Sequence, residues 1–150
     1  MKFSSAEEYG MRCLINFSEA YNSGKTLTIP EISKKEKIPE HTVAKILREL
    51  RLGGFLISER GHTGGYSLSR APEAILIADV LNWLGGKLYE VDMCNKYAGY
   101  NETCIRNKNC RIRSLWQILQ KAVDTALEGI SLKDLAGNSL KPNNKIEMDL

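Results

Sequence analysis

The segment between residues 29 and 52 restricts the fold of this chain more than any other. A short basic helix is expected at about 29–36, and the turn Lys37-Ile38-Pro39 separates it from a second helix at about 40–52. Gly53-Gly54 is a typical end for that second helix. Two short helices joined by a tight turn predict a helix-turn-helix.

A glycine-rich hairpin is expected directly after the second helix. The stretches 55–60 and 66–69 alternate in side-chain character and flank Gly61-His62-Thr63-Gly64-Gly65, a pattern typical of two antiparallel strands. The predicted fold is therefore mainly α with a small β-wing, a winged helix-turn-helix. The second helix is expected to bury one stripe, made of Val43, Ile46, Leu47, Leu50 and Leu52.

Another helix is expected upstream of this unit. Ser4 and Glu7 have the spacing of a capping box, and apolar residues then recur at helical intervals until Asn22-Ser23-Gly24. Cys13 lies on this apolar stripe. Its position predicts a packed core thiol and not a ligand or nucleophile.

Three cysteines lie close together further along the chain. A short helix expected at 77–84 precedes a polar stretch at 92–110, which contains Cys94, Cys104 and Cys110. The asparagines and glycines of this stretch favour turns over packed structure. A long amphipathic helix is expected directly after it, at about 111–128.

The long helix has more apolar surface than a small domain needs. Its apolar residues recur every seven positions in two series, which are Ile112, Leu119 and Ala126, and Trp116, Val123 and Ile130. This repeat favours packing against the same helix of a second copy, and a core helix within one chain is the alternative. The expected parts are a winged domain at 1–86, a cysteine-rich loop at 87–110, a dimerisation helix with closing turn at 111–136, and a disordered tail at 137–150.

Composition excludes several classes of function. No apolar run is long enough to cross a bilayer and no signal-type hydrophobic core begins the chain, so we expect a cytoplasmic protein without a membrane partner. No Ser/His/Asp arrangement, phosphate-binding loop or pair of catalytic acids indicates an enzyme. The net charge of +3 is too small to predict nucleic-acid binding, so the distribution of charge matters more. Basic residues gather around the helix-turn-helix, at Lys34, Lys35, Lys37, Lys45, Arg48, Arg51 and Arg60.

Motifs spread over about residues 1–136 match one family, and the most specific is the wing motif Arg60-Gly61-x-x-Gly64-Gly65-Tyr66-x-Leu68. The others are Met1-Lys2-Phe3-Ser4 with Tyr9, Ile32-Ser33, Ile38-Pro39, Leu47-Arg48-Glu49-Leu50-Arg51-x-x-Gly54-Phe55-Leu56, Ile77-x-Asp79-Val80, Cys110-x5-Trp116 and Ser131-Leu132-x-Asp134-Leu135. Together they resemble the iron–sulfur cluster regulator (IscR-type, or Rrf) family of bacterial winged-helix transcription factors. The resemblance implies a regulator that binds double-stranded promoter DNA.

The N-terminal part of the second helix is the expected base-reading element. In a helix-turn-helix these residues enter the major groove, and here they are Glu40, His41, Thr42, Ala44 and Lys45. Thr42 suits a base edge or a thymine methyl group, and Lys45 suits guanine acceptors or a phosphate. The alternative is that His41 and Thr42 only cap the helix.

The wing is the second expected DNA contact. Arg60 stands at its base, where an arginine can enter a narrow minor groove, and Gly61, His62 and Thr63 follow it toward the tip. Arg48 and Arg51 lie further along the second helix and suit phosphates, which add affinity without sequence preference.

The three loop cysteines are candidate metal ligands. Clustered thiols without a secretion signal more often bind metal than form disulfides, and thiolates suit either an iron–sulfur cluster or zinc. A thiol–disulfide switch is a further alternative. The family resemblance implies that Cys94, Cys104 and Cys110 ligate an iron–sulfur cluster, expected to be of the two-iron, two-sulfur type, with a four-iron cluster possible. The spacing departs from the commoner family pattern of five residues between cysteines, since nine residues separate Cys94 from Cys104.

A fourth ligand is needed to complete such a site. Some family members use a histidine three residues beyond the last cysteine, but that position is Arg113, which has no acceptor lone pair. Other members use an acidic residue near the N-terminus of the partner subunit, and the resemblance places Glu8 there. The alternative for Glu8 is an acid that stabilises the first helical turn. Glu7, Asp92, Glu102 and water are the other candidate donors.

The sequence therefore predicts a homodimeric transcriptional repressor whose operator affinity follows the redox state or occupancy of an iron–sulfur cluster. One alternative keeps the winged helix but makes the signal zinc, thiol oxidation or a small molecule. Another alternative is an iron–sulfur electron carrier, which the wing and the second helix argue against because neither serves electron transfer.

Overall fold

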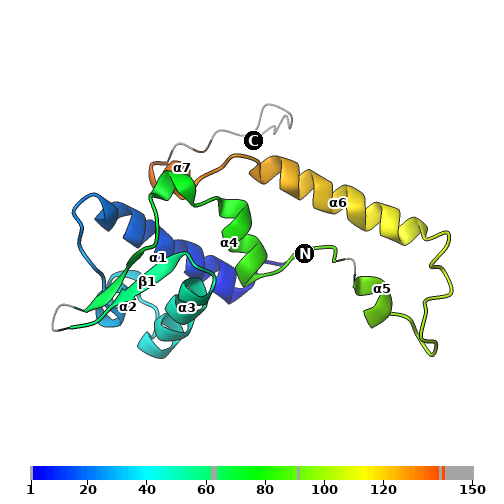
Figure 1. Cartoon of the computed structure of the whole chain (residues 1–150), viewed down its shortest axis with the longest axis horizontal. Coiled ribbons are helices and arrows are strands. Elements are labelled where there is room, and N and C mark those ends of the chain that lie inside the picture. The colour runs from blue at the N-terminus through cyan, green and yellow to red at the C-terminus, as the bar shows by residue number, and fades with distance from the viewer. Residues whose placement is uncertain (1, 62–63, 91, 139, 141–150) are drawn as a thin grey trace. The chain divides into compact units, whose positions relative to one another are not determined.

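The computed structural model describes residues 2–61, 64–90, 92–138 and 140 of the 150-residue chain. These residues form two compact units, one made of the chain up to Gly86 together with the described residues from Gly129 onward, the other of Lys87–Glu128. The model is mainly helical with a two-stranded antiparallel sheet, as predicted (Figure 1). Most of the predicted tail at 137–150 lies outside the described residues.

The first helix, α1 (Ser5–Tyr21), begins at the predicted capping box. The Ser4 N–H donates to Glu7 Oε2 at 2.7 Å, and the Glu7 N–H donates to Ser4 Oγ at 3.3 Å. Cys13, Leu14 and Phe17 of α1 are buried. Cys13 is therefore a core residue, as predicted, and burial raises the pKa of its thiol to about 12.

The helix-turn-helix has the predicted bounds, α2 (Ile29–Glu36) and α3 (Glu40–Leu52). Thr28 caps α2 with a second capping box, in which Thr28 Oγ1 accepts from the Glu31 N–H. Lys37 ends α2 in the left-handed region at φ 58°. Its backbone makes the sharp turn that leads into α3.

The buried face of α3 differs from the prediction at one residue. Val43, Ile46, Leu47 and Leu50 are buried, whereas Leu52 is 51% exposed. The prediction for Leu52 was wrong because this residue is the last of α3, beyond the four residues that the helix buries.

The wing consists of β1 (Leu56–Glu59) and β2 (Gly65–Leu68). Strand β1 is one residue shorter at each end than predicted, and β2 begins and ends one residue earlier than predicted. The register pairs Leu56 with Leu68 and Glu59 with Gly65. Leu27, in the loop before α2, forms an isolated bridge with Tyr66 of β2, through hydrogen bonds of 2.9 and 2.8 Å. The wing is thereby attached to the start of the helix-turn-helix.

The first unit is completed by residues that follow the second unit in the sequence, from Gly129 onward. A 3₁₀ turn (Pro72–Ala74) leads to α4 (Ile77–Leu84), and the late helix α7 (Leu132–Ala136) packs against α1 and the 3₁₀ turn. The Ile77 N–H donates to the Ile130 carbonyl at 3.0 Å, and the Leu132 N–H donates to the Ile75 carbonyl at 2.8 Å. Leu132 is fully buried, so this closing segment contributes to the core of the first unit.

The second unit contains α5 (Met93–Lys96) and α6 (Arg111–Leu127). The short helix α5 lies where the sequence suggested only loop, and α6 has nearly the predicted bounds. Much of the apolar side of α6 is exposed in the single chain, at Ile112, Leu115, Trp116, Ile118 and Leu119. Within the described residues, no helix is both long and apolar enough to span a bilayer.

Candidate functional site

The first two turns of α3 contain the predicted base-reading residues. Glu40, His41 and Lys45 are exposed, and Thr42 is half-buried. Pro39 is the N-cap of α3, and its carbonyl accepts the N–H groups of Thr42 and Val43, both at 3.0 Å. Among the residues that the structure describes, no side chain makes a capping hydrogen bond to the N-terminus of α3, so the alternative that His41 and Thr42 only cap it is wrong.

Arg48 and Arg51 lie on the exposed side of α3. Arg48 Nη1 approaches Glu49 Oε1 at 3.5 Å, and its side chain is 66% exposed. A surface ion pair of this kind contributes at most about 1 kcal/mol. Its weakness leaves Arg48 able to exchange the Glu49 carboxylate for another anion.

The base of the wing depends on glycine. Arg60 is exposed directly after β1, and Gly61 follows it at φ 127°, a conformation that other residues rarely adopt. The Gly64 N–H donates to the Gly61 carbonyl at 2.9 Å, and a Cβ on Gly64 would lie 2.8 Å from the Glu59 and Gly61 carbonyl oxygens. The predicted contacts His62 and Thr63 lie outside the described residues.

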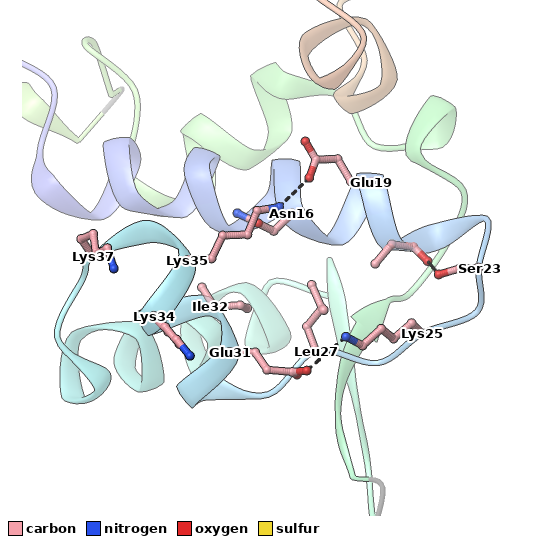
Figure 2. A pocket seen from close by; sticks show the side chains of 11 residues that line it. Asn16, Glu19, Ser23, Lys25, Leu27, Glu31, Ile32, Lys34, Lys35 and Lys37 are labelled. Carbon is pink, nitrogen blue, oxygen red and sulfur yellow. Dashed lines mark hydrogen bonds and ion pairs between the residues drawn. The ribbon is translucent and has the colours of Figure 1, made fainter.

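A groove of about 660 Å³ lies between α1 and α2 and is rimmed by lysines (Figure 2). Two of them are neutralised internally, since Lys35 Nζ lies 2.7 Å from Glu19 Oε2 and Lys25 Nζ lies 3.1 Å from Glu31 Oε1. Within the described part of the chain, Lys34 and Lys37 have no ion pair. The net positive charge of this groove is therefore smaller than its number of lysines suggests.

Two of the three loop cysteines contact the same residue. Cys110 is the N-cap of α6, and its Sγ accepts the Arg113 backbone N–H at 3.3 Å. The Arg113 guanidinium donates to Cys94 Sγ at 3.4 Å and to Asn107 Oδ1 at 2.9 Å. The hydrogen bond and charge of Cys94 raise the pKa of Arg113. Arg113 thus joins α5, the loop and α6.

The third cysteine lies elsewhere in the same loop. Cys104 is half-buried, and its carbonyl accepts the Asn107 N–H at 2.9 Å. All the cysteines are free thiols. Among the described residues, no three His, Cys, Asp or Glu side chains are close enough to hold a metal ion. The donor types fit an iron–sulfur cluster or zinc. Two of the three sulfurs contact one residue, Cys94 through the Arg113 guanidinium and Cys110 through the Arg113 backbone N–H, but the structure does not bring the third sulfur to them.

Glu8 lies in the first turn of α1, in the first unit. It is exposed, and its backbone N–H donates to the Ser4 carbonyl at 3.1 Å. In the described residues its carboxylate makes no hydrogen bond or ion pair. Glu8 therefore has the favourable position of an acid near a helix N-terminus and is also accessible to a ligand.

A model of the Rrf2 family, described as iron-dependent transcriptional regulators, matches residues 3–138. The chain belongs to the Rrf2 family. This match covers both units, from the start of α1 to the end of α7. A regulator of the Rrf2 family binds DNA and is not an enzyme.

Similarity to individual proteins supports the same family assignment. The protein rrf2 of Nitratidesulfovibrio vulgaris is 30% identical over 145 residues, which is 96% of this chain and 93% of that protein. The solved structure of CymR, the global cysteine regulator of Bacillus subtilis, has a TM-score of 0.72 and 25% identity, covering 92% of this chain and 98% of that one. The IscR of T. potens has the same fold, with a TM-score of 0.70 at 21% identity, covering 100% of this chain and 93% of that one.

Proposed function

We propose that this Rrf2 regulator is a cytoplasmic, homodimeric repressor whose operator affinity depends on an iron–sulfur cluster. Cys94, Cys104 and Cys110 would hold the cluster, expected to be of the two-iron, two-sulfur type, and Glu8 of the partner subunit would be the fourth ligand. The observation that carries the proposal is that Cys94 and Cys110 both contact Arg113 at the N-terminus of α6. Cys104 would have to join them by a rearrangement of the loop.

The surroundings of the two thiols suit an anionic group. The guanidinium of Arg113 and the N-terminal end of α6 both favour negative charge, and a cluster held by three thiolates and a carboxylate is anionic. The cluster would supply a centre that changes with oxidation or is lost under iron shortage. The loop residues would then take a different arrangement, since Arg113 holds Asn107 and Cys94 together.

A thiol switch is the second candidate, and one observation favours it. Cys94 and Cys110 share Arg113 without Cys104, an arrangement that suits a pair of thiols better than a set of three ligands. CymR of Bacillus subtilis, which is 28% identical over 136 residues, is a relative whose solved structure is titled the global cysteine regulator.

Serine substitutions at the three loop cysteines test the cluster. Anaerobically purified wild-type protein is expected to absorb visible light and to contain iron and sulfide. Each of Cys94→Ser, Cys104→Ser and Cys110→Ser should lose most of both, because a cluster needs all three thiolates. Cys13→Ala is the matched control and should retain the cluster, since Cys13 is buried in the other unit.

Each alternative gives a different result in the same experiment. Stoichiometric zinc without colour would replace the cluster by a zinc site. A colourless protein that forms a Cys94–Cys110 disulfide with mild oxidant, and changes its DNA affinity on doing so, would support the thiol switch. Full cluster content in Cys104→Ser would contradict the proposed ligand set.

Arginines of the wing and of α3 are expected to play different parts in DNA binding. Arg60→Ala should weaken binding to a selected operator by roughly 10- to 100-fold, with a smaller loss on scrambled duplex, if Arg60 enters the minor groove. Arg48→Ala should weaken both duplexes to the same extent and reduce the slope of log affinity against log salt by about 0.9. Titrations of both variants at several salt concentrations measure this, and equal losses for Arg60→Ala on the two duplexes would contradict its assignment.

A further inference from the structure

Glu36, the last residue of α2, is held by two residues of α1. Arg12 Nε donates to Glu36 Oε2 at 2.9 Å, and Arg12 Nη2 donates to the Glu36 carbonyl at 2.5 Å. Asn16 Nδ2 donates to Glu36 Oε1 at 2.6 Å and to the Arg12 carbonyl at 2.8 Å. Both carboxylate oxygens and the main-chain oxygen of Glu36 are thus bound from one side. We call the set Arg12, Asn16 and Glu36 the α1–α2 bridge.

The α1–α2 bridge lies directly before the turn between α2 and α3, because Glu36 is the last residue of α2. Lys37 follows Glu36 in the left-handed region, Ile38 is buried, and Pro39 caps α3. The Ile38 carbonyl accepts from Ser33 Oγ at 2.6 Å, which holds the far side of the same turn. A shift of Glu36 would therefore move the start of α3, where Glu40, His41 and Thr42 lie.

The bridge is partly buried and directional. Asn16 is 3% exposed, the Glu36 side chain 19% and the Arg12 side chain 37%, so the hydrogen bond from Asn16 is better shielded from water than those from Arg12. Burial by itself would raise the pKa of Glu36, but the hydrogen bonds from Asn16 and Arg12 outweigh it and lower that pKa. Apolar contacts between two helices tolerate small sliding movements, whereas hydrogen bonds of fixed geometry do not.

The same two helices carry a matched contrast. Lys35 of α2 also pairs with α1, at Glu19, but both of these side chains are more than half exposed. Figure 2 shows this second pair reaching across the groove near Asn16. An exposed pair of flexible side chains holds its partners weakly, so it fixes the helices less well than the bridge does.

We infer that the α1–α2 bridge positions the N-terminal residues of α3. Arg12, Asn16 and Glu36 thereby determine how well the protein distinguishes its operator from other DNA sequences, without contacting DNA themselves. This inference rests on the proposed base contacts of α3 and is independent of the cluster. It makes α1, the helix that carries Glu8, the support on which the helix-turn-helix is oriented.

Discrimination between two DNA duplexes tests the bridge. The operator is selected from a random-sequence library with the wild-type protein, and affinities for it and for a scrambled duplex are measured with cluster-free protein. Glu36→Gln and Arg12→Gln are each expected to lower the operator-to-scrambled ratio about tenfold. The double variant should lose no more than either single one, because the two residues act through one contact. Glu19→Gln and Lys35→Gln, the matched controls, should change the ratio less than twofold.

The opposite outcomes are equally definite. An unchanged ratio in Glu36→Gln and Arg12→Gln, or equal losses in the Glu19 and Lys35 controls, would overturn the inference. Equal losses on both duplexes together with a lower melting temperature would show a merely structural role and also overturn it. Asn16→Ser provides a milder variant if the others fail to fold, with the same criterion. Failure of the cluster proposal would leave all these ratios unaffected, since the protein is measured without cluster.

Discussion

Leu47→Ala is expected to lower the free energy of unfolding of the first unit by about 2–5 kcal/mol. Leu47 is fully buried in the middle of α3, which packs against α1, α2 and β1. Removing its side chain deletes apolar contacts on several elements at once and leaves a cavity, because close-packed neighbours relax only in part. Urea denaturation followed by circular dichroism measures the change.

Leu52→Ala is the control for this prediction. It removes the same atoms from the same helix, but Leu52 is 51% exposed, so we expect a change within about 0.5 kcal/mol. If the two variants destabilise the protein equally, the burial of α3 described here is wrong.

Replacing two apolar residues of α6 by glutamate, Leu115→Glu with Ile118→Glu, is expected to lower operator affinity by about 10²- to 10⁴-fold. Leu115 and Ile118 are 49% and 65% exposed in the single chain and lie on one face of the helix. If this face joins two copies, the double variant Leu115→Glu with Ile118→Glu places charges in the interface and yields monomers. Each monomer binds one half-site and loses the high effective concentration that a linked second half-site provides. Sedimentation equilibrium and DNA titration measure the two effects together.

Gln117→Glu provides the matched control for the dimer. Gln117 is exposed on α6, and helical geometry places it about 160° around the axis from Leu115 and about 100° from Ile118, outside the face that these two residues share. It should remain dimeric and bind its operator normally. A dimeric double variant with full affinity would rule out this face as the interface.

The helix-turn-helix could be predicted from sequence because its ends are marked locally. Thr28 and Glu31 form the capping box of α2, and Gly53 follows α3, so the bounds of both helices were correct. Local signals were weaker at Leu52, which is apolar but remains 51% exposed at the end of α3. The four residues of α5 are too few for a helical period to be recognised.

Contacts between distant residues could not be read from the sequence. Arg12 and Glu36 are 24 residues apart, and no pattern distinguishes their pair from the exposed pair of Glu19 and Lys35. The cysteine spacing indicated soft-metal chemistry, but the contact of Arg113 with Cys94 depends on how a 19-residue separation is closed. Sequence reasoning only excluded Arg113 as a metal ligand, because its guanidinium has no acceptor lone pair.

The isolated β-bridge between Leu27 and Tyr66 couples the wing to the helix-turn-helix. A hairpin of two short strands is marginal alone, and here its inner strand is also hydrogen-bonded to the residue that precedes the cap of α2. A tilt of the wing toward a bent duplex would therefore displace Leu27 and the start of α2. In the proposed complex, bending of the DNA at the wing and the position of α3 in the major groove are therefore coupled through these two hydrogen bonds.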